Sequence, residues 1–135
     1  MLKQPLFKEF AIISAVVATL HTIATYLDWY DSVHELDSLL HFLAGVMVAS
    51  FFIWFYFYSG FFRPTNFNKS EYFLIALLGT LLVGVSWEIF ELIMGITGVT
   101  RVQYAFDTSL DVTMDTLGAL VTCLYAIYAK KYAHK

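Results

Sequence analysis

Four long apolar stretches dominate the 135-residue sequence and restrict the folds that it can adopt. They cover residues 6–27, 33–58, 69–94 and 108–129, and each is long enough for the roughly 20 residues that a helix needs to cross a bilayer. Hydrophobic residues make up 59% of the chain and charged residues 14%, against about 45–50% and 25% in soluble domains. The sequence therefore predicts one all-α domain over residues 1–135, an integral membrane bundle of four helices that run alternately up and down.

Basic residues are distributed unequally between the two ends of this predicted bundle. One end receives only Arg101. The other end receives Lys3, Lys8, Arg63, Lys69, Lys130, Lys131 and Lys135. Because cytoplasmic loops carry an excess of lysine and arginine, both termini are predicted to be cytoplasmic. The expected location is the inner (plasma) membrane of the cell, crossed several times.

Short signals at the ends of the stretches predict where the helices begin and stop. Ser32 and Glu35 have the spacing of a capping box before the second stretch, and Asn68 stands at a similar point before the third. Thr108 is a candidate cap for the fourth helix. Gly95 is typical of a helix C-terminus and is expected to end the third helix.

Polar side chains inside the four stretches recur at helical spacing, so that those of one stretch share one face of its helix. Ionisable residues in membrane spans are energetically expensive and are functional candidates by default. Three of the four faces also carry a glycine. The four groups are His21, Thr25 and Asp28 in the first stretch; Asp37, His41 and Gly45 in the second; Gly84, Glu88 and Glu91 in the third; and Asp107, Asp111, Asp115 and Gly118 in the fourth.

The positions of these groups along their helices predict that they meet. The first and third stretches carry their polar residues near their C-terminal ends, and the second and fourth near their N-terminal ends. In a bundle of alternating helices these four ends lie on one side, which the charge distribution predicts to be the outside. We therefore expect a single acidic pocket that opens outwards and is closed below by apolar packing.

The charge of such a pocket requires compensation. An aspartate costs about 2.5–3.5 kcal/mol at the centre of a membrane helix, so four unpaired carboxylates cost on the order of 10 kcal/mol. This is comparable with the whole stability of a domain, about 5–15 kcal/mol. Since Arg101 is the one basic residue predicted at this end, a divalent metal ion is the simplest counter-charge. Oxygen ligands with one or two imidazoles suit Zn, Mn, Fe and Mg alike.

This hypothesis assigns a role to each candidate residue. Glu88, Asp115 and His41 are also candidate catalytic groups, because a carboxyl group or an imidazole in such a pocket can act as an acid or base near neutral pH. Arg101 and Asp37 are candidate substrate-binding residues, Arg101 for an anionic group. The predicted metal ligands are His41, Glu88, Glu91, Asp111 and Asp115.

Three sequence elements resemble the motifs of a known family. Asp37–Gly45 resembles a DxxxHxxxG element, Trp87–Glu91 a WExxE element, and Asp107–Ala119 a DxxxDxxxDxxGA element. In this order they are similar to the YjdF-like family of small bacterial inner-membrane proteins, and the last element is also similar to the end of VanZ-like proteins, which are linked to glycopeptide-type resistance. The resemblance covers most of the chain. It implies a multi-pass inner-membrane protein and implies no particular reaction.

Several classes of function stay open at this point. The net charge of −3 gives no footprint for nucleic acid, and no GxSxG, HExxH or P-loop motif occurs. One hypothesis is a metal-dependent enzyme of the cell envelope that acts on a lipid-linked or headgroup ester or phosphate. The alternatives are a non-enzymatic metal- or proton-binding transporter component or sensor, and a structural subunit of a membrane complex. Membrane lipids are the expected partners, together with a second copy of the chain or a partner membrane protein.

Overall fold

A computed structural model describes residues 5–33, 35–62, 68–96, 100 and 103–133, and its regular secondary structure there is entirely helical. The helices are α1 (Pro5–Tyr26), the four-residue α2 (Trp29–Ser32), α3 (Leu36–Tyr58), α4 (Lys69–Met94) and α5 (Tyr104–Ala133). All except α2 are long and apolar enough to cross a membrane. The predicted all-α membrane fold with four spanning helices is therefore confirmed.

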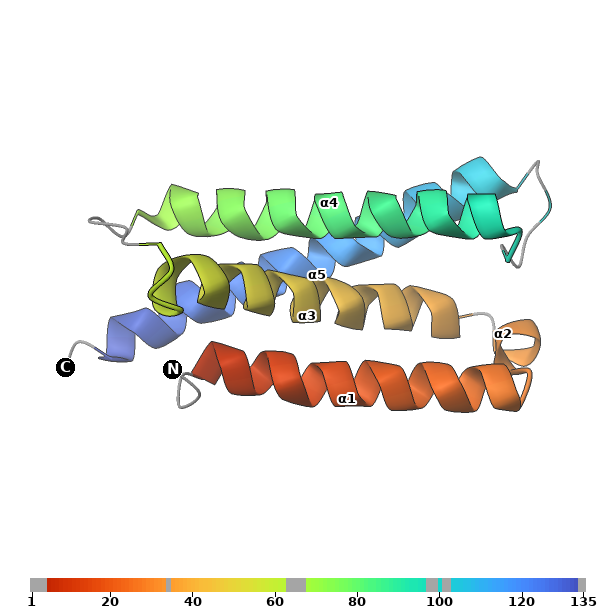
Figure 1. Cartoon of the computed structure of the whole chain (residues 1–135), viewed down its shortest axis with the longest axis horizontal. Coiled ribbons are helices and arrows are strands. Elements are labelled where there is room, and N and C mark those ends of the chain that lie inside the picture. The colour runs from red at the N-terminus through yellow and green to blue at the C-terminus, as the bar shows by residue number, and fades with distance from the viewer. Residues whose placement is uncertain (1–4, 34, 63–67, 97–99, 101–102, 134–135) are drawn as a thin grey trace.

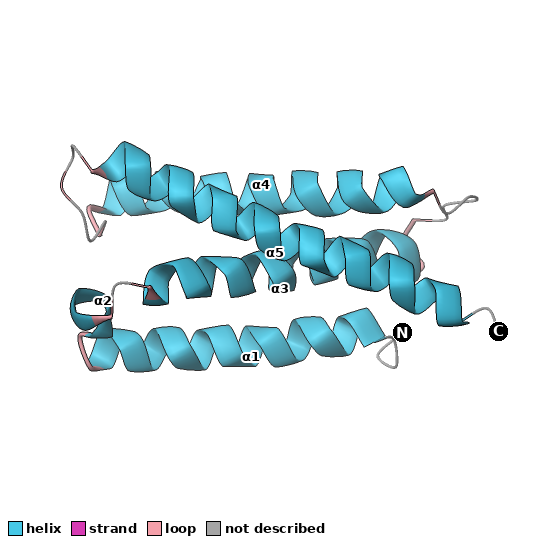
Figure 2. Cartoon of the chain, turned by 180° about the vertical axis from the view of Figure 1, so that it is seen from behind, coloured by secondary structure: helices cyan, strands magenta, loops and turns pink. Residues whose placement is uncertain are grey.

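The spanning helices alternate in direction, and α3 lies at the centre of the molecule. The N-terminal end of α1, the C-terminal end of α5 and the connection from α3 to α4 lie together at one end (Figure 1), which we call the terminal end. Helix α2 and the connection from α4 to α5 lie at the opposite end, as the view from behind also shows (Figure 2). α3 packs against α1, α4 and α5, whereas α1 packs mainly against α3. The core of the bundle is thus formed by α3, α4 and α5.

An apolar cluster closes the bundle at its terminal end. The rings of Phe57 and Tyr72 stack with centroids 4.3 Å apart, and the hydroxyl groups of Tyr58 and Tyr72 lie 2.8 Å apart. Around them small buried side chains fill the space between α3, α4 and α5: Ala49, Ala76, Ala119, Cys123 and Ala126. Because lipid tails are as apolar as these side chains, close packing rather than the hydrophobic effect stabilises such contacts.

Glycines allow α3 and α5 to approach closely. A Cβ atom added to Gly118 would lie 2.7 Å from the backbone nitrogen of Val46 and closer still to the carbonyl oxygen of Phe42. A Cβ atom added to Gly45 would collide with the backbone of Asp115. Small residues at such crossings are typical of membrane helix pairs. This close approach holds the polar faces of α3 and α5 against each other.

Two of the predicted helix starts are wrong. The stretch after α1 forms the extra helix α2, so Ser32 ends that helix instead of capping α3, which begins at Leu36. The chain enters α2 through Asp28, whose φ of 52° is left-handed. At the fourth stretch, α5 begins at Tyr104, one turn before the predicted cap at Thr108. Both errors arise because capping spacings also occur inside helices and turns.

The predicted ends of α4 are confirmed. The side-chain oxygen of Asn68 accepts a hydrogen bond from the backbone nitrogen of Ser70 at 3.2 Å, which satisfies one of the free N–H groups of the first turn. Gly95 ends the helix with a left-handed φ of 66°. Glycine adopts this conformation without steric cost.

Candidate metal centre

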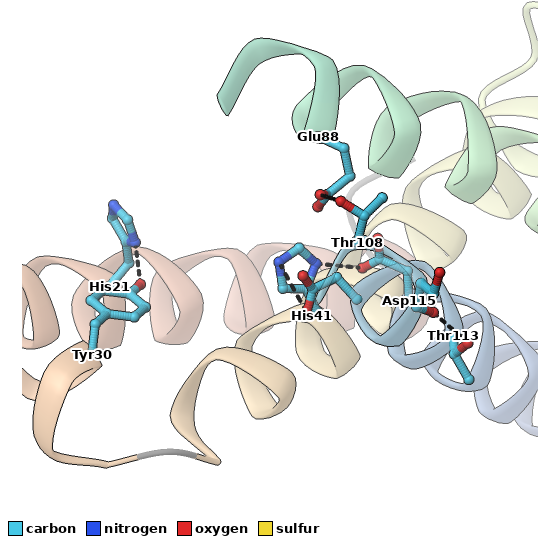
Figure 3. Close-up of polar contacts among 9 residues, drawn as sticks. His21, Tyr30, His41, Glu88, Thr108, Thr113 and Asp115 are labelled. Carbon is cyan, nitrogen blue, oxygen red and sulfur yellow. Dashed lines mark hydrogen bonds and ion pairs between the residues drawn. The ribbon is translucent and has the colours of Figure 1, made fainter. Parts of the chain in front are cut away.

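Helices α3, α4 and α5 bring acidic and histidine side chains together at the end of the bundle opposite the termini (Figure 3). α3 supplies Asp37 and His41 from its first turns, α4 supplies Glu88, and α5 supplies Asp111 and Asp115. The exposed fractions are 8% for His41, 4% for Glu88, 3% for Asp111 and 4% for Asp115. Carboxylates buried to this degree require a hydrogen-bond donor, a proton or a cation.

Three of these side chains have the spacing of a metal site. One ligand atom from each of Asp37, His41 and Asp111 lies within 4.8 Å of the other two. The Nε2 atom of His41 lies 3.9 Å from Oδ1 of Asp111, too far for a direct hydrogen bond. Ligand atoms at about 2.0–2.2 Å from a tetrahedral ion lie roughly 3.5 Å apart. Small side-chain movements would therefore let this trio hold a cation.

The other ring nitrogen of His41 faces a different carboxylate. Nδ1 lies 3.6 Å from Oδ1 of Asp115, while the second oxygen of Asp115 lies so close to Gly84 that a Cβ atom there would clash with it. A carboxylate on one ring nitrogen orients a histidine so that the other nitrogen can bind a metal. At 3.6 Å the two atoms are beyond hydrogen-bond distance, and a small movement of the Asp115 side chain would let it position the imidazole.

Glu88 is held by α5 through two hydrogen bonds. The hydroxyl of Thr108 donates to its Oε2 atom at 2.8 Å, and the hydroxyl of Tyr104 donates to its backbone carbonyl at 2.8 Å. Its Oε1 atom is buried and has no hydrogen-bond partner within the described part of the chain. Sequence reasoning did not find Tyr104 and took Thr108 for a cap, although both are spaced to share a helix face with Asp111.

The polar group of the first helix does not join the cluster. His21 is exposed, and its Nδ1 atom lies 2.6 Å from the hydroxyl of Tyr30 on α2; Figure 3 shows this pair to one side of His41. Burial, with smaller contributions from the charges of Asp37 and Glu91, raises the pKa of Tyr30 to about 12. The expectation that four polar faces meet is thus wrong for the first, because α1 packs at the edge of the bundle.

The remaining predicted site residues lie at the margin of the cluster or outside the described chain. Glu91 is half-buried and lies within electrostatic reach of Glu88 and Asp37. It does not belong to the trio whose ligand atoms converge. Asp107 is also half-buried. Arg101 lies outside the described residues.

The fold and the cluster define a multi-pass membrane protein with a buried group of acidic and histidine side chains. The chain belongs to the family described as predicted membrane protein (DUF2238), which matches residues 2–132. No curated protein and no solved structure matches it.

Proposed function

We propose that this protein binds a divalent metal ion through Asp37, His41 and Asp111. The observation that carries the proposal is the convergence of two carboxylates and one imidazole within 4.8 Å. In the described part of the chain, the buried carboxylates Asp111 and Asp115 are both paired with the ring nitrogens of one residue, His41. A bound cation would neutralise the negative charge that His41 alone leaves on these carboxylates.

The donor set restricts the metal to a group of candidates. Carboxylate oxygens suit Mg and Mn, and an imidazole nitrogen suits Zn and Fe. His41 contributes Nε2, because Asp115 faces its Nδ1 atom at 3.6 Å. Three protein ligands leave coordination positions for water or substrate, which is the arrangement of catalytic rather than structural metal sites.

The site is proposed to face the outer side of the inner membrane. The basic residues Lys8 and Lys69 lie in α1 and α4 near the terminal end, and the positive-inside rule assigns such an end to the cytoplasm. The apolar cluster of Ile53, Phe57 and Tyr72 separates the acidic residues from that end. This supports a site that is reached from one side rather than a path through the chain.

A metal at this depth could act on the polar part of a lipid. When bound, the ion supplies Lewis-acid polarisation of an ester or phosphate oxygen, and Glu88 offers a carboxylate oxygen that has no hydrogen-bond partner among the described residues. We infer a cell-envelope enzyme acting on a lipid-linked or headgroup substrate. The order of its motifs further supports placing the chain in the YjdF-like group of this family.

The metal content of the purified protein tests the proposal. The chain would be purified in detergent without chelators, loaded with Mn²⁺ or Zn²⁺, washed and analysed by elemental mass spectrometry. We expect bound metal in the wild type and a loss of at least 10-fold in affinity for Asp111→Asn. Asp28→Asn is the matched control, because Asp28 is exposed at the same end and asparagine tolerates its left-handed backbone. Equal absence of metal from the wild type and both variants would refute the proposal.

A further inference from the structure

We propose that the same cluster holds a second divalent cation, between Glu88 and Asp111. The inference rests on the proposed function for the first cation and extends it to a paired site. It starts from Glu88, which lies outside the trio of Asp37, His41 and Asp111 and yet is as deeply buried as Asp111.

Only one of the two carboxylate oxygens of Glu88 accepts a hydrogen bond from the described residues. Thr108 donates to Oε2 at 2.8 Å, and this bond fixes the direction of the carboxylate. The Oε1 atom is buried without a partner in the described chain, and the residue as a whole is 4% exposed. In Figure 3 the side chain extends from α4 towards Thr108, on the side of the cluster where His41 lies. An oriented buried carboxylate with a free oxygen is a ready cation ligand.

Asp111 belongs to the first site and lies one helical turn along α5 from Thr108, the residue that holds Glu88. Its Oδ1 atom faces Nε2 of His41 at 3.9 Å, and its charge is within electrostatic reach of Glu88. One turn further along α5, Asp115 is already placed against His41 and Gly84. Asp111 is therefore the carboxylate that two cations can share, one on the side of α3 and one on the side of α4.

The balance of charge supports two ions rather than one. Asp37, Glu88, Asp111 and Asp115 together carry four negative charges when ionised. One divalent cation neutralises two of these charges and a second neutralises two more, while Glu91 at the margin adds a further negative charge when ionised. Paired divalent cations about 3.5–4 Å apart clamp the oxygens of a phosphoryl or related ester group. The inferred ligand class is accordingly an oxyanion of the phosphate type that bridges the two ions.

Manganese titration distinguishes one ion from two. The purified chain would be titrated with Mn²⁺, with stoichiometry from elemental analysis and coupling between the ions from electron paramagnetic resonance. We expect two Mn²⁺ per chain with a spin-coupled signal in the wild type. Glu88→Gln is expected to bind one Mn²⁺ with an uncoupled signal. Glu71→Gln is the matched control, with the same change on the same helix at the terminal end, and is expected to keep two.

Thr108→Val provides an independent variant if Glu88→Gln does not fold. It leaves the carboxylate in place and removes the bond that orients it, so the affinity for the second Mn²⁺ should fall about 10-fold or more. The outcomes separate the two proposals. One Mn²⁺ that is lost in His41→Ala and retained in Glu88→Gln overturns this inference and supports the first site. No Mn²⁺ in the wild type overturns both.

Discussion

The close contact of α3 and α5 predicts that Gly118→Ala destabilises the protein and damages the metal site. The new Cβ atom would lie 2.7 Å from the backbone nitrogen of Val46. Because an ordinary contact needs about 3.5 Å, the two helices would have to separate by at least about 0.8 Å at this crossing, and the closer clash with the carbonyl oxygen of Phe42 requires more. The clash is with backbone atoms, which cannot rotate away as a side chain can. Overpacking of this kind costs about 1–3 kcal/mol.

The separation of α3 from α5 acts directly on the ligands. His41 belongs to α3 and Asp111 to α5, and their ligand atoms are already 3.9 Å apart. Metal–ligand distances tolerate deviations of only about 0.2 Å. Gly118→Ala should therefore weaken metal binding by at least 10-fold, besides lowering the melting temperature by on the order of 4–12 °C.

Gly79→Ala is the matched control for this experiment. Its added Cβ atom would clash with the ring of Phe52, including the Cγ atom nearest the backbone, so this variant also costs stability, but at a contact between α3 and α4 that holds none of the proposed metal ligands. Thermal unfolding in detergent and Mn²⁺ binding would be measured for both variants and the wild type. We expect both variants to melt below the wild type, and Gly79→Ala to retain the metal. If Gly118→Ala matched Gly79→Ala in both measurements, the proposed approach of α3 and α5 would be refuted.

Four further predictions follow from the cluster and its surroundings. Asp115→Asn should weaken Mn²⁺ affinity about 10–100-fold, because the ring of His41 loses its orienting carboxylate; an unchanged titration curve would contradict the role given to Asp115. Mn²⁺ affinity should fall as the pH is lowered from 7 to 5, since protons compete with the metal for carboxylate and imidazole ligands, and a flat profile would argue against these ligands. His21→Phe should leave Mn²⁺ stoichiometry unchanged, because the pair formed with Tyr30 stands apart from the cluster. Reporter fusions should place both termini in the cytoplasm; a periplasmic C-terminal reporter signal would reverse the proposed orientation.

The sequence predicted most of what depends on one helix at a time. The length of each apolar stretch predicted four spanning helices, and the extra residues of α2 were the main omission. Helical spacing correctly grouped Asp37 with His41 and Asp111 with Asp115 on shared faces. Alternation of direction then placed the start of α3, the end of α4 and the start of α5 at one end of the bundle, as the structure confirms (Figure 1).

Residue spacing within one helix could not predict the contacts between helices. Spacing cannot tell which neighbour a polar face meets, so His21 was grouped with the cluster although it pairs with Tyr30 of α2 instead. It also could not distinguish the orienting bond from Thr108 to Glu88 at 2.8 Å from a helix cap, because the same residue spacing serves both.

The sequence by itself determined that this chain forms four membrane-spanning helices with acidic groups at one end, because hydrophobic length and a period of 3.6 residues are properties of the local chain. Only the tertiary structure decided that Asp37, His41 and Asp111 converge while Glu88 turns towards Thr108. The physical reason is that Gly45 and Gly118 let the backbones of α3 and α5 touch, and this contact sets which side chains come within reach of one cation.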